Sequence, residues 1–556
     1  MAGRGHLVVV VPGIGGSVLA RPGRCEDVVW DAGKGDIADL VVRPDRMSVA
    51  ESPRLEPIGL TASTKFLGFT VVPGYEGLLE QLESFGSIDR RGDPRRPRRD
   101  ADVVVVPYDF RRGIVEAADR LDAVVRARLD GLSEAARAGR VIVVAHSMGG
   151  LVARYWLGPL GRWGWCRALI TVGTPHRGAS KALDWLVNGV RLCGVRLGGP
   201  SGLVWDWPAV AQLLPRYPAV RNLTVPADAP NARYPHELPI AGLTAASDAP
   251  DATWYPHELP IDGLTVPADA PDMAWYPHEL PIAGLTAAPD VAWYPHELPI
   301  AGLTAAPDAT WYPHELPVDG LAGPAKAAYD LHVEIEGSWR AMPRGGPEMV
   351  ACMGWSHPTP DACFWDGVSL RVTKQPPDWL DLAGRWMGDF GDGTVPAYSA
   401  LPPELDNQVR GRIRLLDRHV PMACSTRILE LIMDYEGWPP PTLVRGDERS
   451  PAIGLDVEEL HASGQPIPVI VTVREVDADL SGQAMWAQLR PQVVDVAAGM
   501  AGRVSVQLDW DSERGCFSGA LPGQPEGLYE LEVSAREVPQ AGDLAVVDTV
   551  AVVDGD

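Results

Sequence analysis

Long apolar runs, paired cysteines and an excess of positive charge are all missing from this 556-residue chain. No apolar run approaches the roughly 20 residues that a helix needs to span a bilayer. The run Leu7–Val11 is too short for the apolar region of a signal peptide, and no small-residue cleavage site follows it. These absences predict a cytoplasmic protein without a transmembrane helix.

The seven cysteines are scattered along the chain and include no CxxC pair. We therefore expect reduced thiols, with neither a disulfide framework nor a zinc site, no other metal and no cofactor. The formal net charge of −24 argues against a nucleic acid partner, because nucleic acids reward a basic surface. It also disfavours electrostatic attraction to anionic membranes. The arginines between Asp89 and Asp100 suit either a solvated loop or a lipid headgroup patch.

What the chain does contain, over its first 180 residues, is a series of short apolar runs that alternate with helical patterns. Continuous apolar strands of this kind are typical of a parallel sheet that is buried on both faces. The stretch Gly113–Leu132 has its apolar residues at helical spacing. The pattern predicts an α/β fold with strands at Leu7–Val11, Val103–Val106, Val141–Val144, Ala168–Val172, Glu348–Met353 and Arg412–Leu416, and a last helix at Met422–Tyr435.

A long insertion, expected at about residues 180–345, interrupts the strand series and holds a repeat at about 222–322. The pentapeptide Tyr-Pro-His-Glu-Leu begins at Tyr234, Tyr255, Tyr276, Tyr294 and Tyr312. Its histidines cannot imitate the HExxH zinc motif, because proline flanks each unit and breaks helices. We expect this YPHELP repeat to form a solvated loop, extended or turn-rich, that lengthens a cap.

The composition changes after residue 436, where a proline-rich linker at 437–446 is expected. Residues 447–556 show alternating or β-branched runs between Gly and Pro turns. The predicted strands are Ile467–Val476, Val504–Trp510, Leu528–Val533 and Ala545–Val553. Their number and spacing favour a separate all-β, Ig-like sandwich, in which nothing suggests chemistry.

The segment Ala145–Gly150 places Ser147 between a predicted strand and a predicted helix. A nucleophile elbow requires this order, with small residues on both sides so that strand and helix approach closely. The helix N-terminus also favours developing negative charge. We therefore predict that Ser147 is a nucleophile, the alternative being a serine in an ordinary strand-to-helix loop.

A serine hydroxyl needs a base to take its proton and a third group to hold that base. On this fold the acid and then the histidine follow the serine, at the ends of late strands. Asp392 lies in a Gly-Asp-Gly turn and is favoured over its neighbour Asp389 as the acid. His419 follows the last predicted strand and is favoured as the base. Its rivals are His146, His176 and His357.

Two backbone N–H groups must also hold the oxyanion of the tetrahedral intermediate. One is expected from Met148, the residue after the nucleophile, and the other from the loop after an early strand. The sequence Pro12-Gly13-Ile14-Gly15-Gly16 occupies that place, which makes Ile14 the candidate. This loop has neither the GxGxxG spacing nor the GK[ST] ending of phosphate-binding loops.

Taken together, the motifs resemble those of the lecithin:cholesterol acyltransferase family of α/β-hydrolases, over roughly residues 7–436. The resemblance implies an α/β-hydrolase domain at 1–436 and a serine acyltransferase or phospholipase-type hydrolase of glycerolipid esters. It also implies Ser147, Asp392 and His419 as the catalytic triad, with Ile14 and Met148 at the oxyanion. The motifs are Val11–Ser17, Pro107–Arg112, Ala145–Gly150, Gly173–Gly178 and Gly391–Pro396, with His419 and Met422 beyond them.

Two other functions remain open from the sequence. One is a general carboxylesterase or lipase acting on esters other than phospholipids. The other is a non-catalytic lipid-binding scaffold, recruited through its repeats and its C-terminal domain, whose protein partner is unknown. Tryptophans near the start of the insertion predict either an apolar wall for an acyl chain, with peripheral membrane contact through the cap, or plain packing. They are Trp163, Trp165, Trp185, Trp205 and Trp207.

Overall fold

The computed structural model describes most of the chain outside the repeats. The described residues are 5–31, 44–52, 54–61, 75–192, 195–197, 204–216, 220–222, 310–365, 370–374, 390–405, 412–419, 421–435, 451–458, 460–491, 503–512, 514–525 and 527–553. Asp389, the first four copies of the repeat and the expected linker lie outside them.

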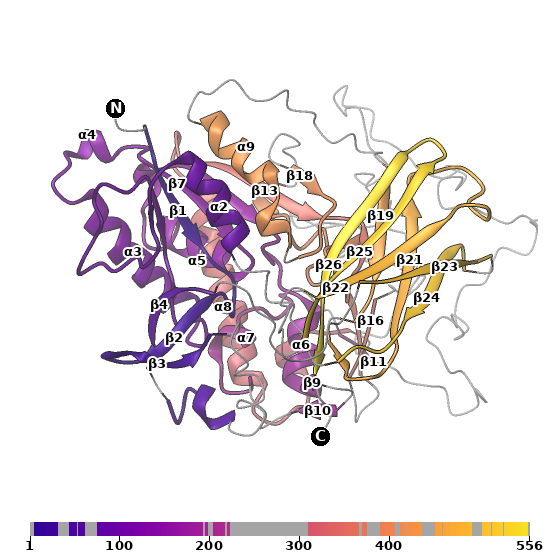
Figure 1. Ribbon diagram of the computed structural model, residues 1–556. Helices are drawn as coiled ribbons and strands as arrows, with labels where there is room; N and C mark the ends of the chain where they lie inside the picture. The colour runs from indigo at the N-terminus through magenta and orange to yellow at the C-terminus, as the bar shows by residue number, and fades with distance from the viewer. Residues whose placement is uncertain are drawn as a thin grey trace, which may run out of the picture.

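A seven-stranded sheet forms the centre of the first part of the chain (Figure 1). All of its neighbouring strands run parallel, as the apolar runs predict. In order across the sheet they are β18 (Arg412–Leu415), β13 (Glu348–Gly354), β8 (Cys166–Val172), β7 (Val141–His146), β1 (Leu7–Val11), β6 (Val103–Val105) and β5 (Ile88–Asp89).

Helices cover both faces of this sheet. Alternate residues of each strand point to opposite sides, and because both sets are apolar, each face packs against helices. Val9 and Val11 pack into one apolar cluster together with α3 (Ile114–Leu129) and α5 (Met148–Leu157). The side chains between them, such as Val10, pack on the other face. The helices there are α2 (Glu76–Phe85) and α9 (Thr426–Tyr435).

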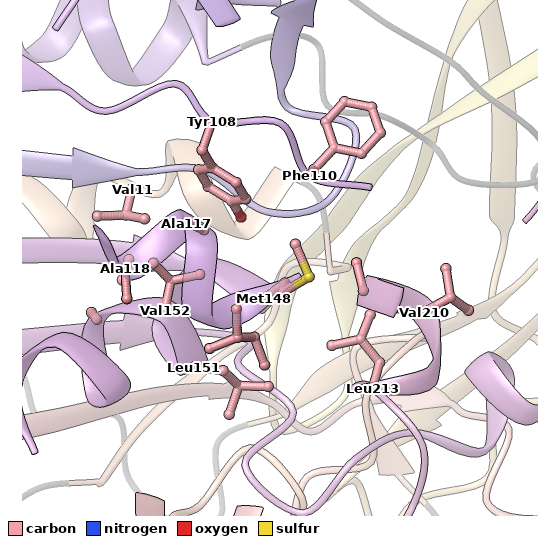
Figure 2. Packing of buried hydrophobic residues seen from close by; sticks show 14 of the residues in the cluster. Val11, Tyr108, Phe110, Ala117, Ala118, Met148, Leu151, Val152, Val210 and Leu213 are labelled. Carbon is pink, nitrogen blue, oxygen red and sulfur yellow. The ribbon is translucent and has the colours of Figure 1, made fainter. Parts of the chain in front are cut away.

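The insertion contributes a cap that is continuous with the first apolar cluster. Its helices are α6 (Ser180–Asn188), α7 (Pro208–Ala211) and α8 (Ala322–Arg340). Figure 2 shows Met148 of α5 beside Val210 and Leu213 of this cap. Trp185 and Trp207 are buried in the same cluster, and Trp163, Trp165 and Trp205 pack against it half-buried. Among the described residues, these tryptophans therefore all contact one apolar cluster, and a role as a wall for an acyl chain stays a prediction.

The fifth copy of the repeat is described, and it forms the short 3-10 helix η6 (Pro313–Glu315). Its Leu316 is buried in the apolar cluster, and its His314 ring lies 5.5 Å from the ring of Tyr329 on α8. This copy therefore contains a short helical turn and is anchored on the cap through its leucine, and the form of the repeat as a whole stays a prediction.

Smaller elements surround these layers. A three-stranded sheet comprises β2 (Ser17–Arg21), β3 (Arg24–Trp30) and β4 (Glu56–Leu60). Strand β14 (His357–Pro358) pairs with β17 (Phe390–Gly391). The remaining elements of this part are η1 (Pro44–Met47), α4 (Glu134–Arg137), η2 (Trp163–Trp165), β9 (Val190–Leu192), β10 (Val195–Leu197), β11 (Val220–Asn222), β12 (Thr310–Trp311), β15 (Ala362–Trp365), β16 (Leu370–Thr373), η8 (Pro403–Leu405) and η10 (Pro421–Cys424).

The C-terminal part is all-β, as predicted, but it is one eight-stranded sheet and not a sandwich of two (Figure 1). Strand β23 pairs with both β22 and β24, which joins the two halves, and the sheet curls until β19 contacts β26. The order is β19 (Ala452–Asp456), β21 (Ile467–Arg474), β24 (Cys516–Leu521), β23 (Val504–Asp511), β22 (Met485–Pro491), β25 (Gly527–Val538), β26 (Gly542–Val553) and β20 (Leu460–Ala462).

Within the described residues, no helix is both long enough and apolar enough to cross a membrane. Six cysteines fall in this part of the chain, and all six are free thiols.

Candidate active site

Ser147 occupies a sharp turn between β7 and α5. Its backbone has φ 52° and ψ −128°, a left-handed conformation that is costly for a residue with a side chain. Close packing on the outer side of the turn enforces this geometry: a Cβ atom on Gly149 would lie 2.5 Å from the carbonyl oxygens of Val11 and Pro12. The structure thus contains the strand-turn-helix arrangement that the sequence predicts for a nucleophile.

Three side chains predicted from separate motifs lie together at this turn. The Ser147 Oγ lies 3.0 Å from Nε2 of His419, and the Nδ1 of His419 lies 2.7 Å from a carboxylate oxygen of Asp392. Because an ionised carboxylate can only accept, Nδ1 carries the proton and donates a hydrogen bond to Asp392. The neutral imidazole then accepts the Ser147 hydroxyl proton at Nε2. All three side chains are buried.

Asp392 is fixed by its own turn. Its second carboxylate oxygen accepts hydrogen bonds from the N–H groups of Thr394 (2.9 Å) and Val395 (2.7 Å). Burial alone would raise the pKa of this carboxyl. The nearby His419 and these hydrogen bonds outweigh burial and hold the pKa of Asp392 below its ordinary value. An acid whose ionised form is favoured therefore faces the His419 ring.

The backbone also ties the acid turn to the histidine. The N–H of His419 donates to the carbonyl of Asp392 at 2.8 Å, although the two residues come from different loops. Asp392 directly follows β17, which β14 holds by antiparallel pairing. Both of these strands are only two residues long, and sequence patterns do not reveal them.

The Gly13–Ile14 turn lies directly beside the nucleophile. A Cβ atom on Gly13 would approach the Ser147 Cβ to 2.8 Å, so only glycine permits this contact. Two buried tyrosine hydroxyls hold the turn. Tyr75 accepts a hydrogen bond from the Gly13 N–H (2.7 Å), and Tyr108 donates one to the Pro12 carbonyl (2.7 Å). This placement is where a donor to the oxyanion must lie, and the roles of Ile14 and Met148 remain predictions.

His146, considered as a rival base, instead links these parts of the site. Its Nδ1 lies 2.9 Å from the Tyr75 hydroxyl and its Nε2 lies 2.9 Å from the carbonyl oxygen of His419. Since that carbonyl only accepts, Nε2 carries the proton and Nδ1 accepts from Tyr75. Burial, together with the neighbouring His419, lowers the pKa of His146 to about 3. His146 is therefore a neutral structural link.

The other two rivals lie in separate polar clusters. His176 is buried with its Nδ1 3.3 Å from Arg154 of α5. His357 is fully buried, with Nε2 2.8 Å from the Leu416 carbonyl and Nδ1 accepting from the Leu455 N–H at 3.1 Å. Each histidine is thus placed by partners other than Ser147.

The arginine-rich loop is placed as a solvated surface. Arg90 pairs with Glu76 and Glu83, and Arg99 pairs with Asp130; all of these side chains are largely exposed. In the part of the chain that the structure describes, no group of three or more His, Cys, Asp or Glu side chains is arranged so that it could hold a metal ion.

Comparison with protein families adds an independent observation. Residues 61–197 match the model of the lecithin:cholesterol acyltransferase family. The resemblance predicted from the motifs is confirmed. The family match implies the α/β-hydrolase fold and an acyltransferase- or lipase-type enzyme of lipid metabolism. The matched segment contains the elbow with Ser147 and Met148, and it ends before the acid and the histidine.

No curated protein matches the chain. Solved structures that match include superoxide reductase (neelaredoxin) from Ignicoccus hospitalis, at 12% identity over 19% of this chain and 80% of that chain, with a TM-score of 0.14. Two single-substitution variants of that protein match at 13% and 14% identity, over 19% of this chain and 81% of theirs, each with a TM-score of 0.14. A likeness at this TM-score carries no argument about fold or function.

Proposed function

We propose that the protein is a serine-dependent acyl ester hydrolase or O-acyltransferase that acts on glycerolipid esters through an acyl-enzyme on Ser147. The observation that carries the proposal is the continuous hydrogen-bond chain from Ser147 through His419 to Asp392 at a nucleophile elbow. The family match supports the lipid class of the substrate.

The first half-reaction follows from this geometry. Ser147 Oγ attacks the ester carbonyl carbon while Nε2 of His419 takes the hydroxyl proton, and Asp392 stabilises the resulting imidazolium. The carbonyl oxygen becomes an oxyanion, which accepts hydrogen bonds from the N–H groups of Met148 and Ile14. One such donor is worth about 2.7–4 kcal/mol of transition-state stabilisation. As the C–O bond breaks, His419 returns the proton to the leaving alcohol.

The second half-reaction uses the same groups in reverse. His419 Nε2 removes a proton from water or from an acceptor alcohol, whose oxygen attacks the acyl-enzyme carbonyl. The Ser147 Oγ then leaves and recovers its proton from His419. Water gives a free fatty acid, and an alcohol gives a new ester. The choice depends on how far the cap excludes water from the acyl-enzyme.

A non-catalytic scaffold has no need of these features. The strained backbone of Ser147 costs stability, and neither that strain nor the aligned hydrogen bonds from Ser147 through His419 to Asp392 serve a protein that only binds lipid. Their joint presence around Ser147 therefore favours an enzyme over a protein that only binds lipid.

A fluorophosphonate probe tests the proposal directly, because it labels activated serines. We expect rapid labelling of the wild type and none of Ser147→Ala, while Ser84→Ala, at an exposed serine on α2, labels like the wild type. If the wild type is not labelled, or if Ser147→Ala is labelled equally, the proposal that the protein is a serine enzyme is refuted. With labelling established, incubation with a phospholipid and a long-chain alcohol distinguishes the two reactions. A wax-type ester indicates transfer, and fatty acid alone indicates hydrolysis.

A further inference from the structure

The C-terminal sheet contacts the loops that carry the acid and the base. The residue before His419 is Arg418, which is 6% exposed. Its Nε lies 3.0 Å from a carboxylate oxygen of Asp548 on β26, and its Nη1 donates to the Leu455 carbonyl of β19 at 3.3 Å. Because β19 and β26 are where the curled sheet meets itself, Arg418 is held at that junction.

The guanidinium of Arg418 also lies against the acid turn. A Cβ atom on Gly393 would be 2.9 Å from Nη2 and 3.2 Å from Nε of Arg418. Gly393 has φ +87° and directly follows Asp392. One side chain therefore contacts the turn that carries the acid, while its own backbone adjoins the base.

Asp548 is well placed to fix this guanidinium. The carboxyl group is 1% exposed and lies on the same face of β26 as the core residues Val546 and Val550, which alternate with it. A buried carboxylate among apolar residues is costly unless it has a charged partner. Arg418 supplies that partner from the other part of the chain.

A second contact supports the same junction. The N–H of Leu455, whose carbonyl binds Arg418, donates to His357, and His357 in turn binds the carbonyl of Leu416 at the end of β18. His357 belongs to β14, the strand that pairs with β17 ahead of Asp392. Leu455 of β19 thus reaches the two triad loops by two contacts, one through its carbonyl and one through its N–H.

We propose that Asp548 is a positioning residue for acyl transfer: by holding Arg418, the C-terminal sheet fixes the Asp392 turn and the His419 loop in their reactive arrangement. The inference rests on the proposed function and extends it. The C-terminal domain, which the sequence suggests is unrelated to the chemistry, completes the active site of the α/β-hydrolase domain.

The test measures three quantities in Asp548→Asn: the second-order rate of fluorophosphonate labelling, and kcat and KM for a soluble short-chain ester. Displacing reactive groups by about 1 Å costs on the order of 100-fold in rate. We expect labelling and kcat to fall 10- to 100-fold, with KM changed less than threefold. A purely structural role would leave kcat of the folded fraction unchanged.

Three further variants keep the test decisive. Asp548→Glu retains the charge and should recover part of the labelling rate. The double variant Arg418→Met/Asp548→Asn removes both buried charges, which proteins tolerate better than the loss of one. Compared with Asp548→Asn, it should therefore be more thermally stable, while its kcat should remain low. Glu532→Gln breaks the partly exposed ion pair with Arg490 in the same sheet, and it should leave kcat and the labelling rate unchanged.

The outcomes separate the two proposals. If wild type is not labelled, the proposed function fails and the inference fails with it. If wild type is labelled and the folded double variant matches it in kcat and labelling rate, the positioning role is overturned while the enzyme stands. Should Asp548→Asn not fold, the double variant and Asp548→Glu decide by the same criteria.

Discussion

Two tyrosines hold the turn on which the oxyanion donor is predicted. Tyr75 and Tyr108 are both 1% exposed and bind opposite polar groups of that turn, the Gly13 N–H and the Pro12 carbonyl. Burial raises the pKa of each hydroxyl, so both remain protonated. Tyr75 also donates to His146, which continues the network to the backbone of His419.

Replacing Tyr75 with phenylalanine removes only the hydroxyl. The Gly13 N–H and His146 Nδ1 would then be buried without their partner, at a cost of about 1–3 kcal/mol. We expect Tyr75→Phe to lower kcat for a soluble ester about tenfold, because the oxyanion turn loses one of its two supports, and to lower the melting temperature by several degrees.

A control for this variant exists in the C-terminal sheet. Tyr529 is 2% exposed, and its hydroxyl donates to the Pro525 carbonyl at 2.9 Å. Tyr529→Phe should therefore cost comparable stability and leave kcat unchanged. An equal loss of kcat in both variants would show that Tyr75 acts through stability alone.

For single residues, those that lie within sequence motifs could be predicted, whereas the residues that hold them in place through distant contacts could not. Ser147, Asp392 and His419 are each marked by glycines or a strand end in their own segment, and the structure brings them together. Tyr75 and Asp548 act across contacts of 62 residues or more, and no local pattern distinguishes them from ordinary core residues.

The elbow between β7 and α5 depends on close approach of α5 to the end of β1. Gly149, in the first turn of α5, is fully buried, and the atoms nearest its missing Cβ belong to the backbone of Val11 and Pro12. Backbone atoms cannot rotate away as a flexible side chain can. An added methyl group would therefore displace either the helix or the oxyanion turn.

We accordingly predict that Gly149→Ala lowers stability by about 1–3 kcal/mol, the usual cost of overpacking. Esterase activity should fall at least tenfold, since the displaced turn carries Ile14. Gly164→Ala is the matched control: that glycine faces open space, so stability should change by less than about 0.5 kcal/mol. Melting curves and initial rates of both variants suffice, and a fully active Gly149→Ala would contradict the argument.

Among the elements, those with strong apolar runs were predictable to within a few residues. Strand β1 matches its predicted bounds, and α3 begins one residue after its expected start. The two-residue strands β14 and β17 are too short to leave a pattern, yet they place the acid. The three-stranded sheet β2–β4 was likewise not predicted, because the burial of β3 changes along its length and β4 is half-buried throughout, so neither strand shows a continuous apolar run.

At the scale of the whole molecule, the two folded parts share polar contacts at the site. The C-terminal sheet was predictable as all-β, but its topology and its contact with the loops that carry Asp392 and His419 were not. Both depend on which strand edges meet and on a single buried ion pair between Arg418 and Asp548. Lys374 adds a second, more exposed pair across the junction, with Asp456 at 2.6 Å.

Buried neutral histidines are distributed through this whole arrangement. Burial is the main cause that lowers the pKa of His146 to about 3, of His332 and His357 to about 4, and of His176 well below its ordinary value. They lie at the elbow, in the cap and at the junction with the C-terminal sheet. Each remains neutral in the folded protein at pH values where the unfolded chain protonates it.

Acid should therefore destabilise the fold well above the range in which carboxylates titrate. Below about pH 6.5 the unfolded state binds more protons than the folded state, so stability falls as pH falls. Near pH 6 the four histidines together take up about three protons on unfolding. Urea titrations between pH 8 and 5 should show constant stability above pH 7.5 and a steep loss below 6.5. His332→Gln should flatten the slope by about one quarter, and a stability unchanged between pH 7 and 5 would contradict the buried neutral state.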